Sequence, residues 1–89
     1  MMGSPLPSPG ELIRAALAER GLTSDDLAAS TRLRRGLLEQ IAADDFIDTG
    51  GDVYARGHLR VIARVLDIDP ESLLAAYDQA PDVRRPPAP

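Results

Sequence analysis

The 89-residue sequence contains no cysteine and a single histidine. The absence of cysteine excludes disulfide bonds and thiolate metal sites, and one histidine excludes most zinc arrangements. No run of 18 or more apolar residues occurs, and the N-terminus lacks a basic region followed by an apolar one. The sequence therefore predicts no membrane-spanning helix, no signal peptide, no metal and no cofactor, and it is compatible with a reducing compartment.

Lysine is also absent, so all ten basic residues are arginines, and fourteen acidic residues give a net charge of -4. This is the wrong sign for a small domain that binds mainly through nucleic-acid phosphates. The sequence also has no glycine-rich phosphate loop and no nucleophile beside a base, and His58 stands without an acid partner. We therefore expect a protein that is not an enzyme.

Apolar spacing and capping signals predict five short helices around one small core, and no segment is typical of a strand. Ser8, Thr23 and Asp69 are expected as N-caps. The helices are expected at residues 9–20, from 24 to a break around 30–33, at 34–43, at 53–66 and from 70 through 77. The domain organisation is then a disordered leader at 1–7, an all-α domain at 8–78 and a Pro- and Arg-rich tail or linker at 79–89.

Residues 53–67 carry three lines of side chains at helical spacing. One line predicts the buried face of this helix: Ala55, Leu59, Ile62 and Leu66. A second line predicts a solvated face, paired with Asp48, Asp52 or Asp67, with a binding patch as the alternative: Arg56, Arg60 and Arg64. The third line flanks the first: Tyr54, His58, Val61 and Val65. Two interpretations of this third line stay open, which are packing under the last helix or the leader, and docking to another protein.

The segment from residue 24 to 43 has the arrangement of two helices joined by a tight turn. Ala28 lies where the first helix must let the second approach, Leu33 fills the turn, and Leu38 and Ile41 anchor the second helix in the core. This pattern resembles the helix-turn-helix of lambda-repressor-like domains, and it implies a five-helix bundle of that class.

DNA binding by this unit is the alternative function. In DNA readers of this class the second helix lies in the major groove, and the residues expected to contact DNA are Arg32, Arg34, Arg35 and Gln40. Arg32 occupies the position at which such turns usually carry glycine. Glu39, Asp44 and Asp45 follow closely, so we interpret the helix-turn-helix mainly as architecture.

Several runs extend the comparison to most of the chain: Leu12-Ile13-Arg14, Ala29-Ser30-Thr31-Arg32-Leu33-Arg34, Asp45-Phe46, Gly51-Asp52-Val53-Tyr54-Ala55-Arg56-Gly57 and Asp69-Pro70-Glu71. Over residues 10–77 the sequence thereby resembles the cytoplasmic N-terminal domain of the RodZ family. These are bacterial membrane proteins that link the actin-like filament protein MreB to the cell-shape machinery. The run at residues 51–57 is the most specific part of this resemblance.

The resemblance implies an adaptor domain that docks on MreB through the helix at 53–66, on the cytoplasmic side of the inner membrane. A transmembrane helix further along the parent chain would anchor it. The residues expected to contact the partner are Tyr54, Arg56, His58, Val61, Val65 and Phe46. Phe46 is also expected, together with Ile47, to plug the core. Tyr54 is the one aromatic residue left where the family usually places several. A monomer is expected, with symmetric self-association through the same face as the alternative.

Overall fold

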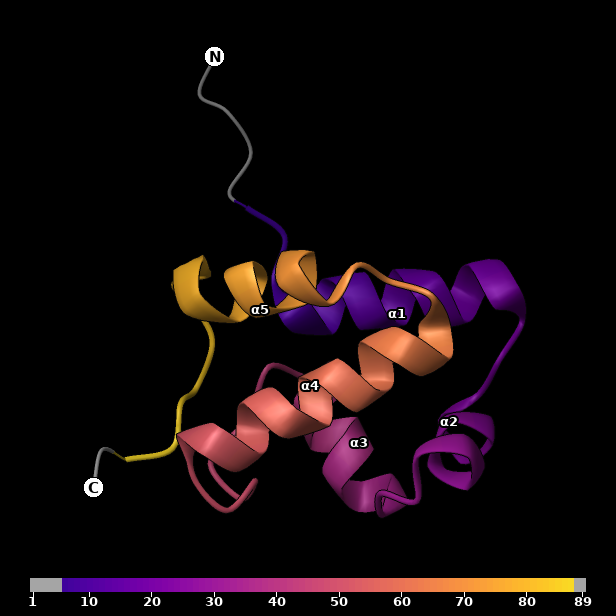
Figure 1. The fold of residues 1–89 in the computed structure, drawn as a ribbon, viewed down its shortest axis with the longest axis horizontal. Helices are drawn as coiled ribbons and strands as arrows, with labels where there is room; N and C mark the ends of the chain where they lie inside the picture. The colour runs from indigo at the N-terminus through magenta and orange to yellow at the C-terminus, as the bar shows by residue number, and fades with distance from the viewer. Residues whose placement is uncertain (1–5, 88–89) are drawn as a thin grey trace.

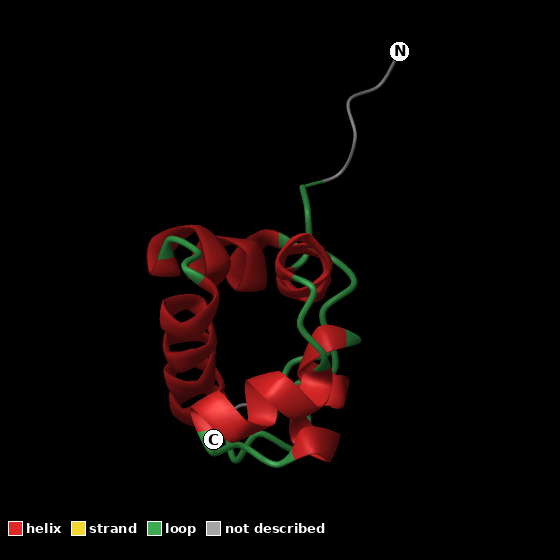
Figure 2. Ribbon diagram, turned by 90° about the vertical axis from the view of Figure 1, so that its right-hand side faces the viewer, coloured by secondary structure: helices red, strands yellow, loops and turns green. Residues whose placement is uncertain are grey.

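The computed structural model describes residues 6–87, and within them the fold is all-α, as predicted (Figure 1). The helices are α1 (Pro9–Arg20), α2 (Ser24–Thr31), α3 (Arg35–Ala42), α4 (Asp52–Leu66) and α5 (Pro70–Gln79). Figure 2 shows the helices arranged around a single interior. Side chains of the hydrophobic core fill this interior. Of the predicted leader, residues 1–5 lie outside the described part of the chain, whereas Leu6 and Pro7 are exposed.

The predicted caps set the starts of three helices. The Ser8 hydroxyl accepts a hydrogen bond from the Glu11 N–H at 3.1 Å, and the Glu11 carboxylate accepts from the Ser8 N–H at 2.9 Å. The bond from the Ser8 N–H, followed by the Ser8 side chain, holds the pKa of the Glu11 carboxyl below its usual value. Thr23 caps α2 in the same reciprocal way, and Asp69 accepts from the Glu71 N–H. Each cap satisfies N–H groups that have no partner inside the helix.

The helix-turn-helix forms as predicted, with Leu38 and Ile41 buried and Ala28 and Leu33 packed against the core. The turn begins at Arg32, whose φ of 63° lies in the left-handed region that favours glycine. Its N–H donates to the Ala28 carbonyl at 2.9 Å and so ends α2. The sequence predicts a variant turn because arginine stands here in the place of glycine. In the structure Arg32 nevertheless adopts the left-handed backbone conformation that glycine would adopt.

The close approach of α1 to the end of α3 depends on Gly10. A Cβ atom at this position would lie 2.4 Å from the Ala42 carbonyl oxygen and 2.8 Å from Asp44 Oδ1. The Gly10 N–H instead donates to that Asp44 oxygen at 2.7 Å. A side chain on residue 10 would therefore push the two helices apart.

The C-terminal segment packs on the domain beyond the predicted boundary at residue 78. Ala80 and Val83 are buried in the core, and an isolated parallel β-bridge joins Asp45 to Arg84. The Phe46 N–H donates to the Arg84 carbonyl, and the Arg84 N–H donates to the Asp44 carbonyl, both at 2.8 Å. The predicted tail thus packs on the domain through residue 85, because its few apolar and backbone groups find partners in the connector between α3 and α4. Residues 88–89 lie outside the described part.

Candidate functional site

Helix α4 presents a complete buried face and a separate apolar face to solvent. Its predicted core line is confirmed, since Ala55, Leu59 and Ile62 are 0% exposed and Leu66 is 1% exposed. On the opposite side Tyr54 is 63% exposed and Val61 is 38% exposed. Because the core is already filled from the other side, the packing of this domain does not require these outward apolar side chains.

The side chains of the predicted third line differ in their exposure to solvent. Tyr54 and Val61 are exposed, whereas His58 and Val65 are half-buried, and Val65 packs against the core. The sequence prediction missed Val53, which is 79% exposed and lies one turn before Gly57. We refer to Val53, Tyr54, Gly57, Arg60, Val61 and Arg64 as the outer face of α4.

The predicted arginine line also divides. Arg60 and Arg64 are exposed, and within residues 6–87 neither has an ion-pair partner. Arg56 Nε instead donates to Asp52 Oδ2 at 2.8 Å, which confirms one of the predicted pairings. Asp67, another predicted partner of the α4 arginines, pairs instead with Arg20 of α1 at 3.6 Å.

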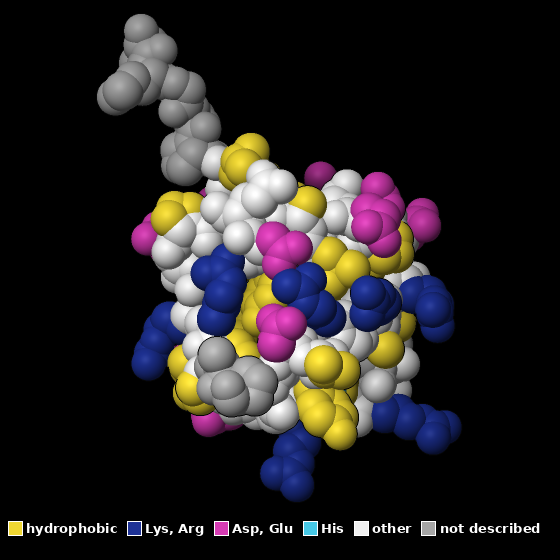
Figure 3. Space-filling model, turned by 60° about the vertical axis from the view of Figure 1, so that its left-hand side comes forward, with side chains coloured by type: hydrophobic (Ala, Val, Ile, Leu, Met, Phe, Trp, Pro, Cys, Tyr) yellow, Lys and Arg dark blue, Asp and Glu magenta, His cyan; other side chains and the backbone are white. Residues whose placement is uncertain are grey.

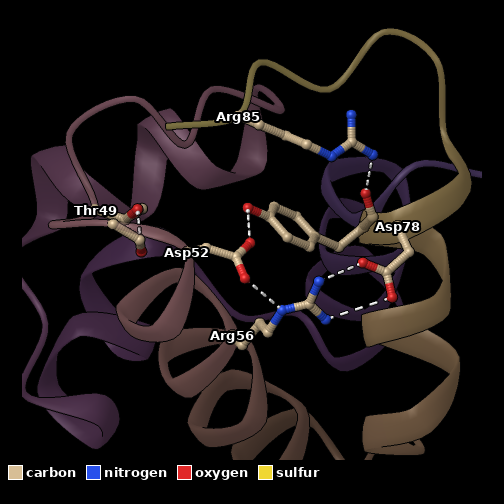
Figure 4. A network of polar contacts seen from close by, with 7 residues as sticks. Thr49, Asp52, Arg56, Asp78 and Arg85 are labelled. Carbon is tan, nitrogen blue, oxygen red and sulfur yellow. Dashed lines mark hydrogen bonds and ion pairs between the residues drawn. The ribbon is translucent and has the colours of Figure 1, made fainter. Parts of the chain in front are cut away.

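Arg56 lies at the centre of a polar network that joins the start of α4 to the end of α5 (Figure 4). Its two terminal nitrogens contact the Asp78 carboxylate, Nη2 to Oδ1 at 2.6 Å and Nη1 to Oδ2 at 3.4 Å. The two carboxylates raise the pKa of Arg56, with Asp78 the larger cause. The hydrogen bond from Arg56 holds the pKa of Asp52 below its usual value. Arg56 is therefore charged, and its donors bind Asp52 and Asp78 within the domain.

Tyr77 is the buried end of this network. Its hydroxyl donates to Asp52 Oδ1 at 3.1 Å, and its ring packs edge-on against Phe46 with centroids 4.8 Å apart. The guanidinium carbons of Arg56 and Arg85 each lie 5.3 Å from the ring centroid. Burial, followed by the bond to Asp52, raises the pKa of Tyr77 to about 12. The neutral phenol is thus the stable form in the folded domain.

Arg85 fastens the C-terminal segment to this network. It donates to the carbonyl oxygens of Tyr77 and Ala80, and Figure 4 shows it on the opposite side of the network from Arg56. Nearby, the Thr49 hydroxyl donates to the Phe46 carbonyl at 2.8 Å and closes the loop before α4. Asp52 and Arg56 thus join the first turns of α4 to α5, and Arg85 joins the C-terminal segment to the end of α5.

Two of the residues predicted to contact a partner make contacts inside the domain. Phe46 is 0% exposed, which confirms its predicted place in the core but leaves no surface for a partner, whereas Ile47, predicted to lie in the core beside it, is 38% exposed. Arg56 directs its donors to Asp52 and Asp78. The face of the molecule over this region carries arginines around a few acidic side chains, with hydrophobic surface between them (Figure 3). The exposed part of the predicted set is Tyr54 and Val61.

The helix-turn-helix offers a second surface. Arg32 and Arg34 are exposed, and within residues 6–87 neither has an ion-pair partner. Arg35, in contrast, pairs with Asp25 at 3.4 Å and Glu39 at 3.3 Å. Gln40 donates to Asp48 at 2.9 Å beside a shallow hollow on the exposed side of α3. The predicted DNA contacts are thus two available arginines and two residues bound to carboxylates.

Two further properties concern only the part of the chain that the structure describes. No group of three or more His, Cys, Asp or Glu side chains is arranged there to hold a metal ion. Between residues 6 and 87, no helix combines the length and hydrophobicity needed to cross a bilayer.

Comparison with known proteins agrees with this geometry. The model of a family described as a helix-turn-helix domain matches residues 12–73. The chain belongs to this family. Among similar proteins is the cytoskeleton protein RodZ of Streptococcus pneumoniae, which is 35% identical over 69 residues. That match covers 78% of this chain and 25% of the relative, so the chain spans about a quarter of the relative's length. The domain is therefore RodZ-like, as the resemblance predicted.

A solved structure gives the same result for the fold. YmfM of Staphylococcus aureus, a membrane protein proposed to bind DNA, superposes with a TM-score of 0.73 and 28% sequence identity. The match covers 83% of this chain and 92% of that one. Nearly all of that structure is therefore the same helical domain.

Proposed function

We propose that this domain is a protein-binding adaptor of a RodZ-like cell-shape protein and that it docks on the actin-like filament protein MreB through α4. The helix-turn-helix family and the relative named as a cytoskeleton protein support a non-enzymatic role connected with the cytoskeleton. Acting on a cytoplasmic filament places the domain on the cytoplasmic side of the membrane, with any anchor elsewhere in the parent chain.

The exposed apolar side chains of α4 carry this proposal. Val53, Tyr54 and Val61 are 79%, 63% and 38% exposed, although α4 already has a complete buried face. Burying a side chain of this size contributes roughly 1.5 to 3 kcal/mol, and aromatic residues often dominate protein interfaces. Tyr54 is therefore the expected anchor, with Val53 and Val61 around it.

Co-sedimentation with polymerised MreB from the same organism tests this function. The wild-type chain should pellet with filaments, and Tyr54→Ala combined with Val61→Ala should reduce the bound fraction at least tenfold, because about 1.4 kcal/mol corresponds to tenfold in affinity. Leu6→Ala is the matched control, since Leu6 is an apolar side chain 55% exposed beside α5. No pelleting of the wild-type chain, or equal pelleting of the double variant, would contradict the proposal.

DNA binding is the second candidate function. The available Arg32 and Arg34 beside the start of α3 favour it, together with the similarity to a protein proposed to bind DNA. A salt titration of duplex binding decides the matter. Affinity in the micromolar range that falls steeply with salt and is lost in Arg32→Ala with Arg34→Ala would support this function, and no binding at low salt would exclude it.

Sedimentation equilibrium of the domain alone tests the self-association alternative.

A further inference from the structure

Gly57 lies in the middle of α4 on its outer face and is half-buried. At about 100° per residue its nearest neighbours on the helix surface are Val53, Tyr54, Arg60 and Val61. A Cβ atom built on Gly57 meets no atom within 4 Å, and its φ is not positive. Neither close packing within the domain nor an unusual backbone conformation therefore explains a glycine here.

This glycine also weakens the fold. Glycine inside a helix lowers the folding equilibrium constant about fivefold relative to alanine, because the unfolded chain gains conformational freedom. At Gly10, in contrast, the packing of the domain itself requires glycine, since a Cβ atom there would lie 2.4 Å from the Ala42 carbonyl oxygen. The space beside Gly57, unlike that around Gly10, is therefore open to a neighbour outside the described fold.

The side chains around Gly57 define the chemistry of such a neighbour. Val53, Tyr54 and Val61 make its immediate surroundings apolar, and Arg60 and Arg64 lie exposed along one edge. From Val53 to the end of α4 the helix contains no acidic residue. Charge complementarity therefore favours a partner that is apolar at its centre and acidic beside the two arginines.

We propose that Gly57 is the point at which a helix of the docked filament subunit crosses α4 in contact with its backbone. The distance between two packed helices is set by the side chains at their crossing, and a glycine allows the closest approach. The crossing helix is apolar at its centre and carries Asp or Glu side chains facing Arg60 and Arg64. This inference rests on the proposed docking to an actin-like filament and assigns the contact residue and the chemistry of the partner surface.

Two alanine variants test the close approach by co-sedimentation with polymerised MreB. Gly57→Ala should raise Tm by roughly 4 to 8 °C, since it removes the helix penalty, and should weaken filament binding about tenfold by placing a methyl group at the crossing. Gly36→Ala is the matched control. Gly36 is also helical with no atom within 4 Å of an added Cβ, but it lies on α3. This control should leave filament binding unchanged.

Two charge reversals test the partner's chemistry. Arg60→Glu with Arg64→Glu should abolish filament binding, whereas Arg32→Glu with Arg34→Glu makes the same change in net charge on the helix-turn-helix and should not. Normal binding by Gly57→Ala, or equal losses in the two charge reversals, would overturn the inference while leaving filament docking intact. Failure of the wild-type chain to pellet would overturn both the inference and the proposed function.

Discussion

The buried hydroxyl of Tyr77 should make the stability of this domain sensitive to alkaline pH. Its pKa is raised from 10.0 to about 12 in the folded state, first by burial and then by the bond to Asp52, although Arg56 and Arg85 act in the opposite direction. In the unfolded chain the phenol returns to its ordinary pKa. Between these values the unfolded chain binds fewer protons than the folded one. The stabilisation is therefore complete below pH 10 and is lost as pH rises toward 12.

The expected loss is large for a domain of this size. One proton gives a slope of about 1.4 kcal/mol per pH unit, so the raised pKa corresponds to about 2 to 3 kcal/mol. The free energy of unfolding of an 89-residue domain is roughly 4 to 13 kcal/mol in total. Because the chain has no lysine and no cysteine, only its two tyrosines have ordinary side-chain pKa values between about 9 and 12. The titration of Tyr77 is thus unusually easy to isolate.

Tyr54→Phe leaves Tyr77 as the only tyrosine, and the ultraviolet absorbance of tyrosinate then reports its ionisation. The midpoint should lie near 12, and chemical denaturation at successive pH values should show stability falling from pH 10 upward. Asp52→Asn should lower the midpoint but leave it above 10, because burial remains. Tyr77→Phe should remove the slope. A midpoint at or below 10 in the folded Tyr54→Phe protein would refute this account, since the two guanidinium groups would then outweigh burial.

Three substitutions test particular features of the fold by thermal or chemical denaturation. Arg32→Gly should stabilise the domain by about 0.5 to 1 kcal/mol because φ is 63°, whereas Arg34→Gly, at φ −64°, should not. Gly10→Ala should destabilise by about 1 to 3 kcal/mol through its overlap with Ala42, against the gain that helix propensity alone predicts. Val83→Ala should cost about 1 to 2 kcal/mol, and no loss would mean that the C-terminal segment does not support the core.

Local patterns were sufficient to predict the helices and most of the core. The line from Ala55 to Leu66 is buried because an apolar residue on every turn leaves only one way to place α4. Ser8 and Thr23 cap their helices because the bonds they make span only three residues. The left-handed conformation at Arg32 was not predicted, because the sequence indicated only a variant turn where such units usually carry glycine.

The polar network could not be predicted in the same way because its members are distant in sequence. Tyr77 and Asp78 lie 25 and 22 residues from their partners on α4, and spacing along one helix gives no signal for such pairs. The C-terminal segment was assigned to a tail since its composition is dominated by Pro, Ala and Arg. Buried Ala80 and Val83, two backbone hydrogen bonds and the contacts of Arg85 nevertheless hold it against the domain.

The run at residues 51–57 meets two demands within two turns of α4. Asp52 and Arg56 face α5 and hold the helix in place, whereas Val53, Tyr54 and Gly57 lie on the outer face. Filament binding alone therefore cannot assign the role of Arg56. Arg56→Ala should lower stability by about 1 kcal/mol, and Tm by roughly 4 to 8 °C, through lost network contacts. Binding should fall as well, because the start of α4 loses its contact with Asp78 of α5. Tyr54→Ala should reduce binding at unchanged Tm, because exposed substitutions have little effect on stability. If Arg56→Ala weakened binding with Tm unchanged, Arg56 would itself be a contact residue.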